Sequence, residues 1–222
     1  MNKVVKINNP NIVIVDYGMG NIRSVHNALA RLGCMVSTSN QAEDILAADA
    51  LILPGVGAFG EAVANLAAYK LITPILSAVK DEGKPLLGIC LGMQLLADTS
   101  EERGSFKGLS LIPGEVRGIP VPKGLRLPHI GWNSLKLQQK EPLFSGINEG
   151  DAFYFVHSYH FVCDATYVAA TTDYGGDVVA AVQRGRVFGV QFHPERSQSK
   201  GLALLGNFVD FVNRDCKERK AC

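Results

Sequence analysis

The first hundred residues alternate between two spacings of apolar side chains. Residues 11–18 (NIVIVDYG) form a short β-branched run that ends at Gly18, which is typical of a buried strand. In residues 21–33 apolar side chains recur every three or four positions instead, and Gly33 ends this predicted helix. The alternation continues with a strand at 34–39, a short helix at 41–48 and a strand at 48–57. A helical region at 61–83, with Pro74 as its expected kink or junction, and a strand at 85–90 follow.

Strands and helices that alternate with short connections predict an α/β fold, a flavodoxin-like doubly wound and mostly parallel sheet. After Thr99 the chain changes to short β-type runs, at 109–119, 134–138, 153–162, 167–174 and 178–192. We expect them to add mostly antiparallel strands on one side of the sheet. An amphipathic helix at 201–215 closes the fold, and a charged tail at 216–220 is expected to fray in solvent. With no linker or repeat, residues 1–222 are predicted to form a single domain.

Composition narrows the class of protein. A chain with 47% hydrophobic and 19% charged residues can bury a core, which excludes disorder. A net charge of +1 without charge blocks indicates no nucleic-acid surface. The five cysteines form no C-x-x-C pair, so neither a disulfide framework nor a cysteine zinc site is indicated. The N-terminus (MNKVVKINNP) lacks signal-peptide features, and no apolar run approaches 18 residues. We therefore expect a cytoplasmic protein without a membrane partner.

The segment Gly88-Ile89-Cys90-Leu91-Gly92 places a lone thiol between two glycines, where a predicted strand turns into a helix. In such an elbow the central side chain is presented at the carboxyl end of the sheet, and the glycines relieve crowding. A helix N-terminus favours a thiolate, and the free N–H of Leu91 points to where an oxyanion would form. A buried structural cysteine explains the residue equally well.

A nucleophile needs a base, and the base needs a group that orients it. His193 follows the last apolar residue of a predicted strand, and Pro194 restricts it to an extended conformation. Glu195 is close enough in sequence to accept a hydrogen bond from the imidazole. Taken alone, His-Pro-Glu at a strand end is most simply a loop. The other histidines have plainer predictions, with His26 on a helix surface, His129 in a loop, and His157 and His160 in a strand.

Two further patterns do not hold up. Gly18-x-Gly20 after the first strand resembles a dinucleotide fingerprint, but Arg23 occupies the third glycine position. His157 and His160 are a possible metal pair, yet on one strand they would face opposite sides, and no third ligand is near. The sequence therefore predicts no cofactor and no metal.

The chain order Cys90, His193, Glu195 resembles that of the class I glutamine amidotransferases, whereas α/β-hydrolases separate the acid from the histidine. The segments PGVGAFGEA (54–62), LPHIGWNSL (127–135) and YFVHSYHF (154–161) look like those of the glutaminase subunits of imidazole glycerol phosphate synthases, enzymes of histidine biosynthesis. DYGMGNIRSV and FHPERSQSKGLALLGNF match as well, so the resemblance spans about residues 11–213.

The resemblance implies that Cys90 forms a γ-glutamyl thioester with glutamine, that His193 carries the proton, and that Glu195 orients His193. It implies an oxyanion hole formed by backbone N–H groups, and contacts to the substrate from four further residues. The implied oxyanion residues are Leu91, Val56 and Gly57, and the implied substrate contacts are Gln94, Glu102 (to the α-ammonium), Ser158 and Tyr159. Gln94 could instead lie on a helix surface, and Glu102 could be a solvated loop charge.

The resemblance also implies a partner, because ammonia must be passed directly to an acceptor. In this family the partner is a (β/α)₈-barrel cyclase, which forms a heterodimer with the glutaminase and makes imidazole glycerol phosphate and AICAR. The candidate interface residues are Asn21, Pro128, Trp132, Tyr154 and Arg196. A core position explains Trp132 about equally well. The alternatives are the glutaminase of another class I system (anthranilate, GMP or pyridoxal phosphate synthesis), a cysteine hydrolase, or a non-catalytic interaction module.

Overall fold

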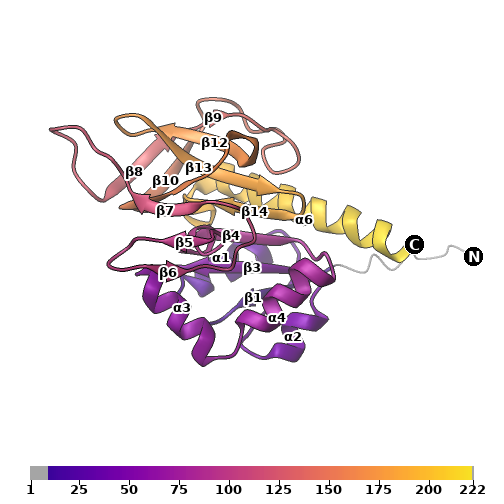
Figure 1. Ribbon diagram of the computed structural model, residues 1–222. Helices are drawn as coiled ribbons and strands as arrows, with labels where there is room; N and C mark the ends of the chain where they lie inside the picture. The colour runs from indigo at the N-terminus through magenta and orange to yellow at the C-terminus, as the bar shows by residue number, and fades with distance from the viewer. Residues whose placement is uncertain (1–9, 222) are drawn as a thin grey trace, which may run out of the picture.

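The computed structural model describes residues 10–221 and contains one large sheet of eight strands (Figure 1). Five parallel strands follow the order β2-β1-β3-β4-β14, which confirms the predicted doubly wound, flavodoxin-like core. Three antiparallel strands, β13, β12 and β9, extend the sheet beyond β14. The strands are β1 (Asn11–Val15), β2 (Met35–Ser39), β3 (Ala50–Gly55), β4 (Leu86–Cys90), β9 (Lys136–Leu137), β12 (Val168–Asp173), β13 (Asp177–Arg184) and β14 (Val187–Val190).

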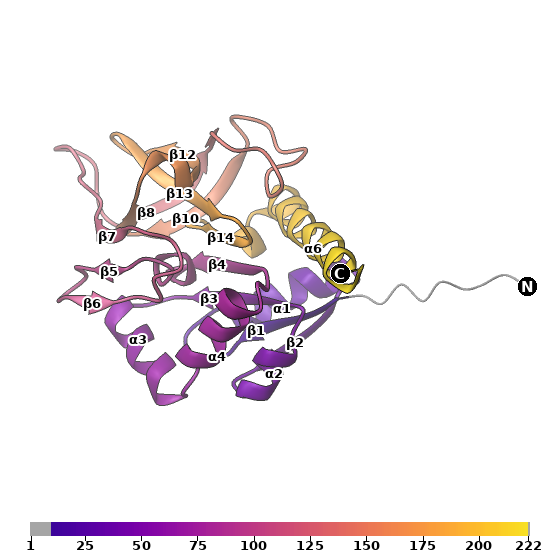
Figure 2. The same cartoon turned by 45° about the vertical axis from the view of Figure 1, so that its right-hand side comes forward.

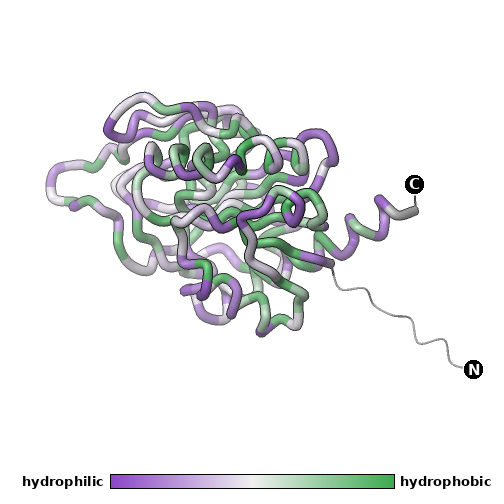
Figure 3. Tube along the Cα trace, turned by 90° about the horizontal axis from the view of Figure 1, so that it is seen from below, coloured by the Kyte–Doolittle hydropathy of each residue, from purple (hydrophilic) through white to green (hydrophobic). Residues whose placement is uncertain are grey.

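Helices cover both faces of the parallel strands (Figure 2). On one face, α1 (Ile22–Arg31) and α6 (Gln198–Ala221) pack in a core that includes Ile12 and Ile14 of β1. On the other, α2 (Ala42–Ala47), α3 (Phe59–Ala68) and α4 (Ile72–Leu76) pack in a second core that includes Val13 and Val15. Successive strand side chains point to opposite faces, so a strand covered on both sides must be apolar throughout. The hydrophobic centre of the chain trace in Figure 3 reflects this arrangement.

Two smaller sheets lie beside the large one, and they show that the predicted run at 153–162 is not one strand. β10 (Ala152–His157) pairs with β8 (His129–Ser134). After Ser158, β11 (Tyr159–Val162) pairs instead with β7 (Glu115–Gly118). β7 also pairs with β5 (Thr99–Ser100), which forms a hairpin with β6 (Phe106–Lys107). The expectation of added, mostly antiparallel strands is therefore confirmed, although their division between sheets differs.

The helical region at 61–83 divides close to Pro74, the expected kink or junction, and the break itself lies just before the proline. α3 ends at Ala68, Lys70 adopts a left-handed φ of 58°, and α4 begins at Ile72, so Pro74 occupies the first turn of α4. A proline is tolerated there because the N–H groups of a first turn have no intrahelical partner. α4 continues as a π-helix over Ser77–Asp81. Within residues 10–221 no single helix is long and apolar enough to cross a membrane. The helices at Phe59–Ala68 and Ile72–Asp81 together have the length and composition of a membrane span, but they are bent by 98° relative to each other.

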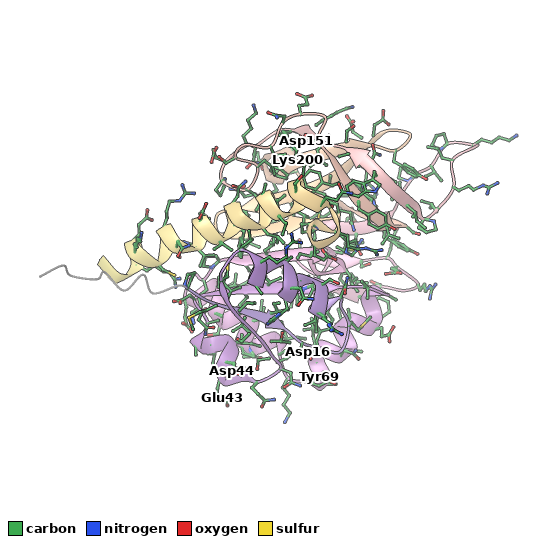
Figure 4. The ribbon with its side chains drawn as sticks, turned by 180° about the vertical axis from the view of Figure 1, so that it is seen from behind. Asp16, Glu43, Asp44, Tyr69, Asp151 and Lys200 are labelled. Carbon is green, nitrogen blue, oxygen red and sulfur yellow. The ribbon has the colours of Figure 1, made fainter. Side chains whose placement is uncertain are left out.

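The C-terminal tail does not fray as predicted. α6 continues to Ala221, Cys216 is buried, and Arg219 forms an ion pair with Asp215 at 2.7 Å. Near the start of the same helix, Lys200 forms an ion pair with Asp151, with 2.6 Å between Nζ and Oδ2, and the two labels lie side by side in Figure 4. The prediction that concerns the N-terminal residues falls almost entirely on 1–9, outside the described residues.

Candidate active site

The elbow at the end of β4 has the predicted geometry, and the two glycines are required for it. Cys90 has φ 55° and ψ −111°, a backbone conformation that residues other than glycine rarely adopt. A Cβ on Gly88 would lie 2.6 Å from the Gly92 carbonyl oxygen, and a Cβ on Gly92 only 1.7 Å from the Leu53 carbonyl oxygen. Larger residues would therefore push the strand and the turn apart, so the glycines hold the strained cysteine in place.

Two details of the elbow differ from the prediction. Cys90 is 6% exposed rather than fully presented to solvent. The helix that follows, α5 (Leu91–Gln94), is a single turn, so its dipole contributes little. Stabilising a negative charge on the sulfur consequently depends on a neighbouring cation.

His193 supplies that neighbour. β14 is the parallel neighbour of β4, with Val190 opposite Ile89, so the residues after β14 run beside Cys90. His193 Nδ1 lies 2.9 Å from Glu195 Oε1, and both side chains are almost completely buried. Pro194 opens a short 3₁₀-helix that folds Glu195 back under the imidazole. The ring therefore donates through Nδ1–H to the carboxylate and turns Nε2 away from it.

The electrostatics of the site favour a charged imidazole. Burial lowers the pKa of His193, but the neighbouring Cys90 sulfur and the Glu195 carboxylate outweigh burial and raise it to about 10. His193 Nε2 is buried and has no hydrogen-bond partner among residues 10–221, so it is available to a reacting group. A thiolate beside an imidazolium is the arrangement that makes a cysteine a good nucleophile.

A pocket of about 430 Å³ opens over Cys90. It collects residues from the turn after β3, the elbow, the β5–β6 turn and the break between β10 and β11. Its lining includes all the predicted oxyanion and substrate residues, namely Val56, Gly57, Leu91, Gln94, Glu102, Ser158 and Tyr159. His193 and Glu195 are outside this lining.

Gln94 is buried, so the helix-surface alternative is wrong. Its amide nitrogen donates to the Tyr159 carbonyl and to Gln191 Oε1, both at 3.0 Å. Gln191 in turn places its own amide nitrogen 3.7 Å from the Cys90 sulfur. The sequence prediction missed Gln191, although an uncharged polar residue at the end of the apolar run 187–192 was a usable signal.

Glu102 is not a solvated loop charge. Its Oε2 accepts a hydrogen bond from the backbone N–H of Phe59, the first residue of α3, at 2.8 Å. The pocket wall opposite is held in a similar way, because the buried Tyr17 hydroxyl donates to the Pro54 carbonyl at 2.7 Å. Burial and the nearby Cys90 raise the pKa of Tyr17, which keeps its proton in place for this bond. Tyr17 also went unpredicted.

A second histidine system supports the pocket from behind. His129 lies in β8 and is buried, so its assignment to a loop is wrong. Its Nδ1 lies 3.0 Å from His157 Nε2, and His157 Nδ1 lies 2.8 Å from the Tyr159 carbonyl oxygen. His129 Nε2 faces the Asn133 amide nitrogen, at 3.3 Å. Because that amide and that carbonyl fix the two ends, each ring donates through Nδ1–H and accepts at Nε2.

Both of these rings are neutral. Burial lowers the pKa of His157 to about 3, and burial likewise lowers that of His129. His160 lies in a different sheet from His157, so the two do not form the pair considered from sequence. No group of three or more potential metal-ligating side chains occurs within residues 10–221.

Three of the five predicted interface residues form one cluster. Trp132 is 50% exposed, which contradicts a core position, and its ring meets that of Tyr154 edge-on at 6.1 Å. The Arg196 guanidinium stacks over Tyr154 at 4.7 Å. The Tyr154 carbonyl accepts from the His193 N–H at 2.9 Å, so this cluster adjoins His193. Asn21 occupies the N-cap position of α1 without a side-chain cap hydrogen bond, and Pro128 lines the pocket. Among residues 10–221 neither shares a ring contact with the cluster.

Comparisons with known proteins agree with this site. Residues 13–211 match the class I glutamine amidotransferase family. The imidazole glycerol phosphate synthase subunit HisH of Moorella thermoacetica is 50% identical over 202 residues, which are 90% of this chain and 95% of the relative. The HisH subunit of Syntrophotalea carbinolica is 47% identical, with 90% and 99% covered.

Solved structures resemble the fold. A putative GMP synthase subunit from Thermoplasma acidophilum superposes with a TM-score of 0.72 at 19% identity, covering 96% of this chain and 98% of that one. The PurLQS structure from Thermotoga maritima gives 0.70 at 21% identity, with 92% and 99% covered. At these identities the likeness supports the architecture alone. The sequence matches go further: this chain belongs to the class I glutamine amidotransferases, in the family of the HisH subunits of imidazole glycerol phosphate synthase.

Proposed function

We propose that this chain is the glutaminase subunit of an imidazole glycerol phosphate synthase, which hydrolyses glutamine and passes the ammonia to a cyclase subunit. The relatives named as HisH subunits support the assignment over 90% of the chain. The observation that carries the chemistry is a strained cysteine, Cys90, beside an imidazole whose other nitrogen is held by a buried carboxylate.

The reaction follows from the atoms in the pocket. The Cys90 thiolate attacks the side-chain carboxamide carbon of glutamine and forms a tetrahedral intermediate. His193 donates its Nε2 proton to the leaving nitrogen, so that ammonia departs and a γ-glutamyl thioester remains. The same nitrogen then takes a proton from water as the water attacks the thioester, which releases glutamate and restores the thiolate and imidazolium. Glu195 holds the ring in the required tautomer throughout. No step requires a metal or cofactor.

The negative charge on the intermediate needs donors that are already in position. We assign this role to the backbone N–H of Leu91 and to one N–H from Val56 or Gly57. Gly57 has φ +103°, a backbone conformation that residues with a side chain rarely adopt, so the turn favours glycine. Losing one oxyanion donor costs roughly 10²–10³ in rate.

The Gln94 amide nitrogen is used by the protein, which leaves its carbonyl oxygen free to accept from the substrate. Glu102 contacts the α-ammonium of glutamine, and Ser158 and Tyr159 line the opposite side of the substrate.

Ammonia is largely protonated in neutral water, so a synthase must take it up where it forms. The cluster of Trp132, Tyr154 and Arg196 is the docking surface that we propose, since aromatic and arginine side chains are favoured anchors. Trp132 and Arg196 are exposed, and Tyr154, which contacts both, is half-buried. The partner would be a cyclase with a (β/α)₈ barrel, forming a heterodimer. The location in the cytoplasm stays a prediction.

A direct test is alkylation with a diazoketone analogue of glutamine, with the cyclase present. We expect one adduct on Cys90, found by peptide mass spectrometry, together with complete loss of ammonia release. Cys163 is a matched control, because burial and Asp164 raise its pKa to about 11 and its thiol stays protonated. C163A should label as wild type does, whereas C90A should not label. Absence of both label and ammonia release in the complex would instead favour a non-catalytic module.

A further inference from the structure

One charged residue of the pocket has no role in the reaction described above. Arg103 lies in the turn between β5 and β6, immediately after Glu102, and lines the pocket over Cys90. Its guanidinium makes no ion pair, hydrogen bond or ring contact within residues 10–221. Arginine usually finds a carboxylate or an aromatic face, so a free guanidinium at a pocket wall has its donors available to a ligand.

The backbone holds this side chain at the pocket in an unusual conformation. Arg103 has φ 55°, a left-handed conformation that favours glycine, and Gly104 follows at φ 156°. Strain of this kind persists where the surroundings over-determine the backbone, and it concentrates at ligand sites.

The turn is tied down on both sides of Arg103. Glu102 Oε2 accepts from the Phe59 N–H, and Glu101 Oε1 accepts from the Gly118 N–H at 3.0 Å. Phe106, at the end of the hairpin, packs so closely on Gly60 of α3 that a Cβ there would lie 2.5 Å from the ring. The backbone at Arg103 is therefore fixed relative to the pocket, although the side chain itself is exposed.

The charges of the lining match the far end of a bound amino acid. With its carboxamide at Cys90, glutamine presents an α-ammonium and an α-carboxylate toward the rest of the pocket. Glu102 and Arg103 are the charged side chains of the lining, one of each sign, and His157 is neutral. An adjacent acid and base would hold a zwitterion by both of its charges.

We propose that Arg103 is a specificity-determining residue, whose guanidinium binds the α-carboxylate of glutamine. The proposal rests on the glutaminase function and deepens it. Such a contact would let the pocket distinguish free glutamine from glutamine within a peptide or with a blocked α-carboxyl group. Arg103 binds the substrate far from the reacting carbon, so replacing Arg103 is expected to raise KM more than it lowers kcat.

The test compares two substrates in the complex with the cyclase. L-Glutamine is measured against its α-N-methylamide, in which the α-carboxylate is a neutral amide and only the side chain can release ammonia. In Arg103→Ala, kcat/KM for glutamine should fall about tenfold or more, as expected for a lost charge-assisted hydrogen bond. For the methylamide it should change less than about twofold, so the preference for glutamine collapses. Arg103→Lys should keep part of that preference.

Two controls distinguish recognition of the α-carboxylate from a general disturbance of the hairpin. Arg103→Gly relieves the left-handed backbone, so it should keep or raise Tm and still lose the preference. Lys107→Ala removes an exposed cation of the same hairpin that does not line the pocket, and should leave kcat/KM unchanged for both substrates. Equal losses on both substrates, or no loss on glutamine, would overturn the inference and leave the glutaminase assignment standing. A wild-type complex that released no ammonia would overturn that assignment and this inference with it.

Discussion

The pocket adjoins two buried histidine systems, one with a positively charged ring and one with neutral rings. Burial lowers the pKa of His193 and of His157 alike, yet His193 ends at about 10 and His157 at about 3. The difference comes from the neighbours. His193 faces a carboxylate and a sulfur, whereas His157 faces a second imidazole and a backbone carbonyl. Burial alone therefore does not determine the charge of an imidazole, and the hydrogen-bond partner decides it.

The two systems also differ in what they contribute. The Nε2 of His193 has no hydrogen-bond partner within residues 10–221, and this is why we assign the proton transfers to His193. Both nitrogens of His157 are occupied, and its Nδ1–H is bonded to the Tyr159 carbonyl, which also accepts from Gln94. Stacking of His129 on Phe155 and Tyr174, with ring centroids 4.8 and 4.0 Å away, immobilises the pair further. We infer that this neutral pair positions the pocket wall.

The largest expected effect on catalysis comes from replacing His193, the charged ring of the two systems. His193→Asn removes the proton carrier, so kcat for ammonia release should fall by at least about 10⁴-fold. His157→Asn removes a positioning residue and should lower kcat/KM by about tenfold or less. Both are measured in the complex with the cyclase, after Tm and formation of the complex have been checked. Losses of similar size in the two variants would contradict the division of roles.

A smaller effect is expected when His193 keeps its ring but loses its carboxylate. In Glu195→Gln the ring is no longer held in one tautomer, and kcat should fall about 10³-fold. The missing charge also lowers the pKa of His193. Since the leaving amine is protonated by the imidazolium, activity is lost as pH rises through that pKa, and the alkaline limb of kcat/KM should move to lower pH.

Glu102→Gln is the matched control for this change. It alters a substrate contact, so it should raise KM and leave the alkaline limb where it was. An unshifted limb in Glu195→Gln would show that Glu195 does not set the charge of His193.

The parts of the site that sequence predicts are those built from contiguous residues. Gly88, Cys90 and Gly92 specify the elbow because the crowding that demands the glycines arises within one turn. Pro194 brings His193 and Glu195 together within three residues. The parallel half of the sheet follows in the same way from local spacing of apolar side chains, since each doubly covered strand must be apolar on both faces.

The parts that sequence misses depend on tertiary contacts. His129 and His157 are 28 residues apart and meet only because β8 pairs with β10. The alternation over 153–162 is the same for one strand as for two strands in different sheets, so the break at Ser158 is invisible locally. The bend before α4 carries no glycine or proline at Lys70 itself, whereas Pro74 is compatible with a first turn. In contrast, the i,i+4 spacing of Asp215 and Arg219 is visible in the sequence and favours a longer helix than the one predicted over 201–215.

The smallest expected effect is on the pH dependence of stability, and it tests whether His157 is neutral in the folded protein. The folded-state pKa of His157, about 3, is below the unfolded value near 6.5, so its neutral form is favoured by folding. The stability that results is fully present above pH 6.5 and is lost as pH falls through 3. A shift of this size corresponds to at most about 5 kcal/mol, at 1.36 kcal/mol per pKa unit.

His157→Gln can keep both hydrogen bonds without titrating, so its urea-unfolding free energy should fall less steeply between pH 6.5 and 4 than that of the wild type. If wild type and His157→Gln lost stability in parallel, His157 would already be charged in the folded protein, and the contrast with His193 would fail.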